Sequence, residues 1–234
     1  MKKVFGFLIA CLIFMVVVAG LYIHSVWNPS IPSTLIRKVH QQAAQHGGYT
    51  SISQIPVFLQ NALIDTEDRN FYHNHGFDIT SLIRALIVDV SHGTFAQGGS
   101  TITQQLVKDM LLSSEKTIQR KLKQVALASM VSQSLSKNQI LELYFNEVYF
   151  GQGAYGITQA AQVYFHRPVN QLTKAECTLL AGLPQAPSAY DPIVHFALAK
   201  QRQKIVINSM IRAGILSIHE GQTLFSQPLF LATS

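Results

Sequence analysis

The sequence predicts a mainly α-helical domain preceded by one N-terminal transmembrane helix. After residue 50, apolar residues recur at helical spacing almost throughout, and the alternating pattern of a half-buried strand is scarce. Residues 4–23 contain no charged side chain and are numerous enough to cross a bilayer as a helix. The 234 residues, 48% of them hydrophobic, suffice for one well-buried domain but not for two independent enzymes.

The apolar run near the N-terminus is predicted to be a retained anchor. Lys2 and Lys3 precede it, and positively charged residues stay on the cytoplasmic side. The run ends in bulky residues, unlike the small-residue site at which a signal peptide is cleaved. We therefore expect residues 1–23 to be a short cytoplasmic tail and a transmembrane anchor, with the rest of the chain outside the cytoplasm.

A connector and then the main domain are expected after the anchor. Residues 24–50 contain two prolines and two glycines, and are interpreted as a juxtamembrane connector with a helical piece at 35–45. The main domain is expected to occupy residues 51–234. Its periodicity predicts helices at 57–70, 78–91, 101–112, 114–135, 137–145, 156–165, 174–183 and 194–213.

The charge balance indicates an anionic partner. Only 13% of the residues are charged, yet the net charge is +6. Nucleic acid, phospholipid and a phosphorylated substrate would all satisfy this balance. The expected position outside the cytoplasm argues against nucleic acid.

Glu67 is a candidate general base. On a continuous helix it shares a face with Leu63 and Phe71, four positions away on either side. Apolar neighbours would partly desolvate the carboxylate and favour its protonated form, as suits a group that accepts a proton. The alternative for this segment is an ordinary acidic helix end.

The neighbouring His73, His75 and Asp78 are close enough in sequence to suggest a metal site. No further ligand follows at a spacing typical of zinc sites, and no HExxH or CxxC pattern is present. We interpret the segment as a polar turn in which His75 or Asp78 braces the neighbouring acidic residues by hydrogen bonds. No metal site is predicted with certainty.

The stretch that follows Gly98 and Gly99 has the features of an anion site. Thr101 and Gln104 have the spacing of a capping box at a helix start. Exposed amides at a helix N-terminus, with Lys108 two turns further on, attract an anion. The alternative is a capped surface helix.

A second basic group lies at Arg120, Lys121 and Lys123, with Gln124 on the same helix face as Arg120 and Lys121. Such a cluster by itself is typical of a solvated face. Together with Lys108 it would suit a diphosphate.

Taken in order, these segments resemble the peptidoglycan glycosyltransferases of glycosyltransferase family 51. These biosynthetic transglycosylases occur alone or as the N-terminal domain of bifunctional penicillin-binding proteins. The resemblance covers about residues 56–208, and five motifs in the right order make it specific. They are Glu67-Asp68-x-x-Phe71-x-x-x-His75-Gly76-x-Asp78, Gly99-Ser100-Thr101-Ile102-Thr103-Gln104-Gln105-x-x-Lys108, Arg120-Lys121, Ser136-Lys137-x-x-Ile140-Leu141-Glu142-x-Tyr144-x-Asn146-x-x-Tyr149-Phe150-Gly151 and Ala181-Gly182-Leu183-Pro184-Gln185-Ala186-Pro187-x-x-Tyr190-x-Pro192.

The resemblance implies a lysozyme-like helical domain with a smaller, membrane-abutting lobe, and a processive, inverting polymerisation of lipid II. Glu67 would deprotonate the 4-hydroxyl of the incoming GlcNAc, whose oxygen attacks C1 of the growing strand's MurNAc as undecaprenyl diphosphate leaves. The diphosphate would be bound by Lys108, Arg120 and Lys121. Asp68 and His75 would organise the base. Sugar or phosphate oxygens would be held by Ser100, Thr101, Gln104 and Gln105.

The chain departs from the family pattern at Gln124, where the third motif normally has a glutamate. Glutamine keeps the shape and the hydrogen bonding but loses the charge, so it should bind a divalent cation less well. On charge alone, Gln124→Glu is expected to raise the rate or its response to metal. No cofactor is expected to be required, with magnesium or manganese as an optional aid to the diphosphate.

Two alternatives stay open from the sequence. One is a catalytically degenerate, membrane-tethered module that binds lipid II or glycan, which Gln124 favours. The other is a lysozyme-like glycan hydrolase, against which the anchor and the basic cluster argue. The expected partners are lipid II, the growing glycan strand, membrane lipid, and the penicillin-binding transpeptidases and other cell-wall synthesis proteins. The expected location is the cytoplasmic (inner) membrane, with a single pass and a periplasmic catalytic domain.

Overall fold

The computed structural model describes residues 20, 25–78, 99–115 and 117–232. Within these ranges the regular structure consists of helices, with one isolated β-bridge between Tyr149 and Tyr155. The prediction of a mainly α-helical domain is therefore confirmed, while the likeness to lysozyme and the smaller membrane-abutting lobe stay predictions.

Two predicted helices lie almost wholly outside the described residues. They are the transmembrane helix at 4–23 and the helix at 78–91, of which only Gly20 and Asp78 are described. Among the helices of the described ranges, none is long and apolar enough to span a bilayer.

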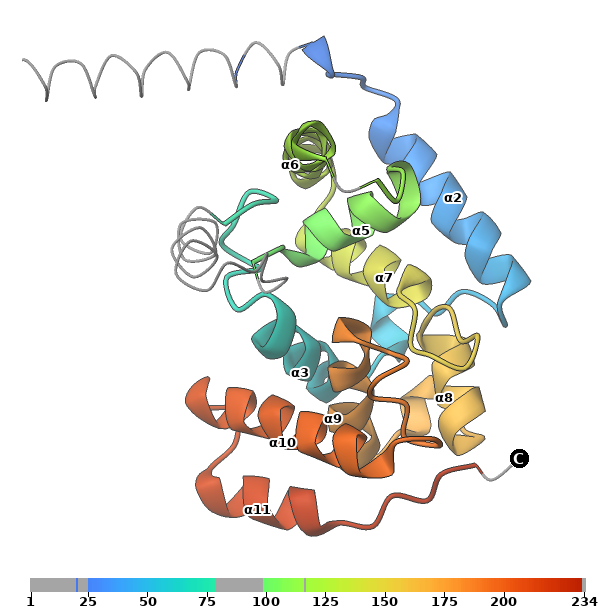
Figure 1. Cartoon of the computed structure of the whole chain (residues 1–234), viewed down its shortest axis with the longest axis vertical. Coiled ribbons are helices and arrows are strands. Elements are labelled where there is room, and N and C mark those ends of the chain that lie inside the picture. The colour runs from blue at the N-terminus through green and yellow to red at the C-terminus, as the bar shows by residue number, and fades with distance from the viewer. Residues whose placement is uncertain (1–19, 21–24, 79–98, 116, 233–234) are drawn as a thin grey trace, which may run out of the picture.

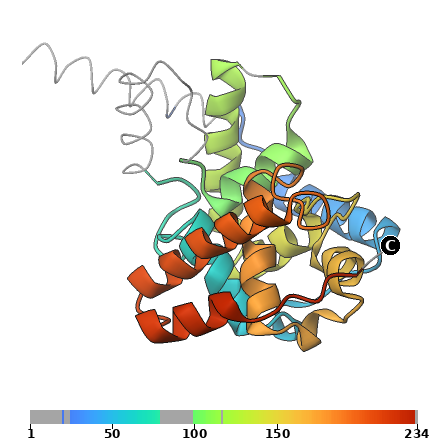
Figure 2. The ribbon, with the colours of Figure 1, turned by 60° about the horizontal axis from the view of Figure 1, so that its bottom comes forward.

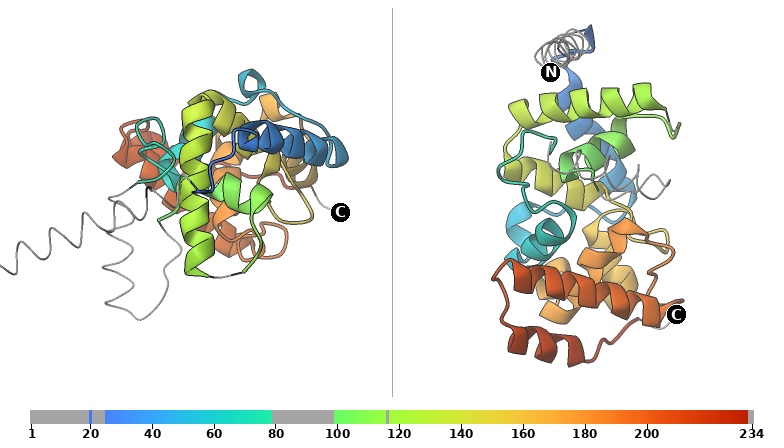
Figure 3. Two further views of the ribbon diagram at one scale, coloured as in Figure 1. Left: turned by 90° about the horizontal axis from the view of Figure 1, so that it is seen from above. Right: turned by 60° about the vertical axis from the view of Figure 1, so that its left-hand side comes forward.

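The first group of helices packs at one end of the domain (Figure 1). It consists of α2 (Ile31–Gln45), α5 (Ile102–Leu111), α6 (Ile118–Ser134) and α7 (Lys137–Glu147). Helix α5 packs between α6 and α7, and α2 contacts all three. In the right-hand view of Figure 3, α6 lies across the top of the domain.

The second group forms the opposite end. It consists of α3 (Val57–Glu67), α9 (Lys174–Gly182), α10 (Phe196–Arg212) and α11 (Ile218–Ser226). Helices α3, α9 and α10 pack against one another, and α11 runs beside α10 (Figure 2). Helix α8 (Ile157–Phe165) packs beside α7, and short 3₁₀ turns lie at Ile52–Gln54, Val169–Gln171 and Leu183–Gln185.

Polar side chains fix where several helices begin. The capping box predicted for Thr101 and Gln104 is confirmed, since each side chain bonds the other residue's backbone N–H. The same arrangement starts α7, α9 and α11. Helix α11 was absent from the sequence prediction, although Ser217 and Glu220 carry this signal.

Helix α3 ends at Glu67, so the prediction that it continues to residue 70 was wrong. Asp68 leaves the helical conformation, with φ −156°, and the N–H of Phe71 bonds the Asp68 carbonyl in a turn. The Asp68 carboxylate accepts from the N–H of Ile102 at the start of α5, which draws the chain away from the helix axis. Phe71 is therefore not a helical neighbour of Glu67, and Glu67 stands at the helix end.

Candidate active site

A cleft of about 490 Å³ opens beside the C-terminal end of α3. One wall comes from residues 65–70, and a second comes from residues 99–101 before α5. The face of α10 that carries Arg202, Ile205, Ser209 and Arg212 closes the third side. Segments far apart in sequence therefore meet at this point.

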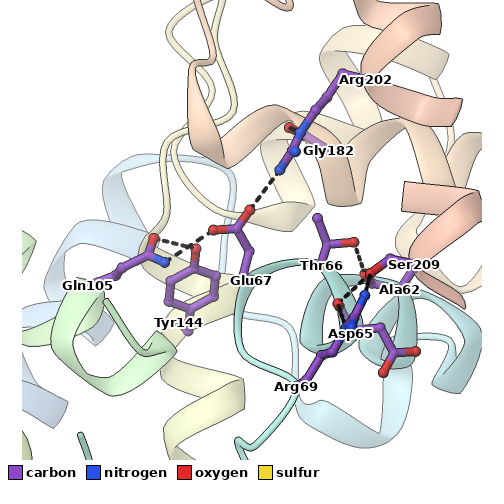
Figure 4. Close-up of polar contacts among 10 residues, drawn as sticks. All are labelled: Ala62, Asp65, Thr66, Glu67, Arg69, Gln105, Tyr144, Gly182, Arg202 and Ser209. Atoms are coloured by element: carbon purple, nitrogen blue, oxygen red, sulfur yellow. Dashed lines mark hydrogen bonds and ion pairs between the residues drawn. The ribbon is translucent and has the colours of Figure 1, made fainter. Parts of the chain in front are cut away.

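The Glu67 carboxylate is held at this cleft by two donors (Figure 4). Arg202 Nη2 donates to Oε1 across 3.0 Å, and Gln105 Nε2 donates to Oε2 across 3.2 Å. The Glu67 side chain is 11% exposed. Its carboxylate thus faces polar donors instead of the apolar pair expected from the sequence, although Leu63 is buried as predicted.

Gln105 is itself held by a third helix. The Tyr144 hydroxyl of α7 donates to Gln105 Oε1 across 3.1 Å. Tyr144 is fully buried, and burial followed by the nearby charge of Glu67 raises its pKa well above the ordinary value. Its hydroxyl therefore stays protonated and available as a donor.

Arg202 was missing from the predicted site. Its Nε donates to the Gly182 carbonyl across 3.0 Å at the end of α9, which aims the guanidinium at Glu67. A Cβ on Gly182 would lie 2.9 Å from Arg202 Cγ, so the glycine leaves room for the arginine stem. A sequence signal existed: Ala199, Arg202, Gln203 and Val206 have the spacing of a buried helix face, and an arginine on such a face needs a partner.

Asp68 supports the backbone around the site. Its carboxylate accepts from Asn74 Nδ2 and from the Ile102 N–H, while Lys137 Nζ donates to Asn74 Oδ1. Burial raises the pKa of Asp68 to about 6, against the lowering effect of these hydrogen bonds. Asp68 thus fixes the turn after α3 to the start of α5, whereas His75 is exposed.

The predicted polar residues before and within α5 divide into two kinds. Thr101 and Gln104 are buried; Thr101 Oγ1 donates to the Gly76 carbonyl, and Gln104 completes the capping box. In this structure both side chains therefore bond backbone groups, at Gly76 and at the start of α5. Ser100 lines the cleft, and its Oγ accepts from Lys121 Nζ across 2.8 Å.

The three predicted basic residues gather where α5 meets α6. The pKa of Lys121 is lowered, first by burial and then by the charges of Arg120 and Lys108. Lys108 Nζ lies 3.0 Å from Asp109 Oδ1, and this acidic neighbour was not predicted. Arg120 Nε is buried without a hydrogen-bond partner among the described residues. The three side chains therefore lie close to one another, and within the described part of the chain the Arg120 Nε donor has no partner.

Gln124 links the two helices that carry this cluster. Its side chain is buried, at 1% exposed, and its Nε2 donates to the Gln104 carbonyl across 2.7 Å. The amide thus ties α6 to the first turn of α5. A carboxylate in the same place could not donate to this carbonyl unless it carried a proton.

Within the described ranges, no three His, Cys, Asp or Glu side chains are grouped so that they could hold a metal ion. Asp78 accepts from Asn70 Nδ2 across 3.1 Å, close to the turn expected from the sequence.

Comparison with known proteins gives one family. A family model described as "Transglycosylase" matches residues 33–211. The chain is 43% identical to penicillin-binding protein 1A of Neisseria gonorrhoeae over 207 residues, which is 87% of this chain and 26% of that protein. It is 44% identical to penicillin-binding protein 1A of Aquifex aeolicus over 181 residues, which is 77% of this chain and 25% of that protein.

The chain thus spans about a quarter of the length of these relatives. Among solved structures, the match to penicillin-binding protein 1A of Haemophilus influenzae covers 80% of this chain and 18% of that protein's chain. Its TM-score is 0.46 and the sequence identity is 19%.

Proposed function

Because this chain belongs to the transglycosylase family, we propose that it polymerises lipid II into peptidoglycan glycan strands, with Glu67 as the general base. The observation that carries the proposal is the Glu67 carboxylate at the cleft, oriented by Arg202 and Gln105. Among the described residues, each oxygen accepts one hydrogen bond, which leaves further lone pairs to accept a proton from a substrate hydroxyl.

In the proposed reaction, Glu67 takes the proton from the 4-hydroxyl of the GlcNAc of an incoming lipid II. The hydroxyl oxygen forms a bond to C1 of the MurNAc at the end of the growing strand. The bond from C1 to the diphosphate breaks, and undecaprenyl diphosphate leaves with the electron pair. Attack opposite the leaving group inverts C1 and gives a β-1,4 linkage.

Lys108, Arg120 and Lys121 are proposed to stabilise the departing diphosphate. Fixed positive charges near a group that gains negative charge lower the barrier most when they are already in place. Ser100 orients Lys121, and Arg120 Nε offers a buried donor that lacks a partner within the described chain. An anion bound here would offset the burial and the neighbouring charges of Arg120 and Lys108, which together lower the pKa of Lys121.

No required cofactor is part of the proposal. Magnesium or manganese would only add to the neutralisation supplied by the three basic side chains. Gln124 does not supply a charged ligand, and its amide nitrogen is engaged with the Gln104 carbonyl.

The substrate's lipid suits the proposed membrane anchor at residues 1–23, with the catalytic domain on the periplasmic side of the inner membrane. We propose penicillin-binding transpeptidases and other cell-wall synthesis proteins as partners, because the matched relatives carry the name penicillin-binding protein 1A.

A second candidate is a module that binds lipid II without polymerising it. Gln124 favours it, because a neutral, buried amide stands where the family pattern has a carboxylate. A glycan hydrolase is less favoured, since a neutral glycan has no need of the basic cluster.

One experiment separates these functions. The purified full-length chain in detergent is incubated with labelled lipid II, and the products are separated on a gel. We expect a ladder of long strands from wild type and from Glu115→Gln, which changes an exposed carboxylate, but none from Glu67→Gln. Binding of lipid II without a ladder would favour the module, and shortening of preformed strands would favour the hydrolase.

A further inference from the structure

We propose that Tyr144 is a positioning residue that acts on Glu67 through the side-chain amide of Gln105. This proposal rests on the proposed function of Glu67 as the base. The three side chains come from α7, α3 and α5 respectively, and form one hydrogen-bonded series (Figure 4). Neither α7 nor Tyr144 lines the cleft, so Tyr144 exerts its effect without touching the substrate.

The two ends of the Gln105 amide are chemically different. An ionised carboxylate only accepts hydrogen bonds, so the amide must turn its NH₂ group toward Glu67 Oε2. Its carbonyl oxygen then faces Tyr144, whose hydroxyl donates to it. This donation stabilises the amide orientation in which Gln105 supports the negative charge of Glu67.

Tyr144 is suited to be a permanent donor. The ring is fully buried, Gln105 is the partner of its hydroxyl, and the surrounding groups favour the protonated phenol. The phenol therefore keeps its proton over the pH range in which the base works, and it cannot turn toward water.

Removing the Tyr144 hydroxyl takes away no charged group around Glu67. Arg202 faces the carboxylate from α10, and Gln105 is the neutral donor from α5. Among the described residues, the other charged or titratable groups near the series include Asp65, Asp68, Arg69 and Arg212 in the cleft with Glu67, and Glu147 and Asp109 near Tyr144. Since these groups persist in Tyr144→Phe, a change in pH behaviour reports the lost hydroxyl.

The first test is the pH dependence of polymerisation by full-length Tyr144→Phe. Without the hydroxyl, the Gln105 amide is less firmly held, and the charged form of the base loses part of its support. We expect the acid limb of the pH–rate profile to move to higher pH by up to about one pH unit. The matched control is Tyr164→Phe, which removes another buried hydroxyl, one that donates to the Phe150 carbonyl across 2.9 Å. It should leave the acid limb unchanged.

The second test is a double-mutant cycle. Gln105→Met removes the donor and should shift the acid limb at least as far as Tyr144→Phe does. If Tyr144 acts through Gln105, then Tyr144→Phe adds no further shift in the Gln105→Met background. Additive shifts of the acid limb would contradict the claim that Tyr144 acts through Gln105.

An NMR titration makes the proposal independent of turnover. Isotope-labelled glutamate carboxyls are followed against pH, with Glu67 assigned from Glu67→Gln. A higher titration midpoint for Glu67 in Tyr144→Phe, but not in Tyr164→Phe, supports the role of Tyr144. This result holds even if the wild type does not polymerise lipid II. Failure to polymerise would contradict only the proposed function. Equal Glu67 midpoints in wild type and Tyr144→Phe would overturn the proposed role of Tyr144. If Tyr144→Phe does not fold, the midpoint in Gln105→Met decides, and an unchanged value overturns the proposal.

Discussion

The guanidinium of Arg202 donates to Oε1 of Glu67 across 3.0 Å, although 135 residues separate them in the chain. Both side chains are largely withdrawn from water, at 7% and 11% exposed. A hydrogen-bonded ion pair of this kind is costly to break by removing one partner, since the other charge is then left buried. Arg202 is therefore expected to orient the base as well as to join α10 to α3.

Arg202→Lys should lower the polymerisation rate about tenfold to a hundredfold, which corresponds to the loss of one charge-assisted hydrogen bond. Lysine keeps the charge but lacks the two separate guanidinium nitrogens that donate to the Gly182 carbonyl and to Glu67. The rate is measured with labelled lipid II, and Arg37→Lys on the exposed face of α2 serves as control. A normal rate in Arg202→Lys would show that the pair does not orient the base.

Glu67→Gln should lower polymerisation about a hundredfold to ten-thousandfold, because a positioned general base is lost. Lipid II binding should stay close to that of wild type, since the amide has nearly the same shape. Binding is measured by titration of labelled lipid II, and turnover is measured in the same preparation. Turnover at the wild-type rate would rule out Glu67 as the base.

Lys108→Met should weaken binding of lipid II more than binding of a diphosphate-free glycan, by about tenfold, because it removes a charge-assisted contact to the diphosphate. Lys123→Met is the matched control, since Lys123 is exposed and lies outside the described contacts of the cluster. Equal losses for the two ligands would argue against a diphosphate-binding role for Lys108.

Gln124→Glu should lower both stability and rate near pH 7.5, which reverses the expectation from charge alone. An ionised carboxylate would face the Gln104 carbonyl and lose the donated hydrogen bond, at a cost of about 1–3 kcal/mol. The thermal midpoint and the rate are measured with and without magnesium. Gln133→Glu, an exposed change on the same helix, is the control. A faster, more metal-responsive Gln124→Glu would restore the expectation based on charge.

Asp68 should make the protein less stable as the pH rises from about 4 to 6. Its pKa is about 6 in the folded protein and 3.8 in the reference state, so the folded form binds more protons in this window. The stability that it contributes is fully present below pH 3.8 and is lost as the pH passes 6, up to about 3 kcal/mol. The pH dependence of the thermal midpoint should be flatter in Asp68→Asn. An unchanged slope would contradict the raised pKa.

Local patterns predicted most of the described helices. Apolar periodicity located α3, α5 to α10 and part of α2, and the Thr101 capping box set the start of α5. The end of α3 was predicted three residues too late because Asp68 bonds the Ile102 N–H, a contact that no local pattern reveals. Helix α11 was missed although its capping box at Ser217 and Glu220 is a local signal, and Gly221 within it packs against Ile211.

The sequence by itself determined which residues are candidates for the site. Glu67 and the basic residues at 108, 120 and 121 were singled out from residue types and spacing, and the resemblance to the family marked the departure at Gln124. These features depend on local order along the chain, which the sequence carries directly.

Only the tertiary structure decided which side chains meet. Arg202 and Tyr144 became part of the site because α10, α7 and α5 pack so that their side chains converge on the end of α3. Helical periodicity fixes the face on which a side chain lies, but it does not specify the helix opposite. For that reason the orientation of Glu67 could not be predicted from its own segment.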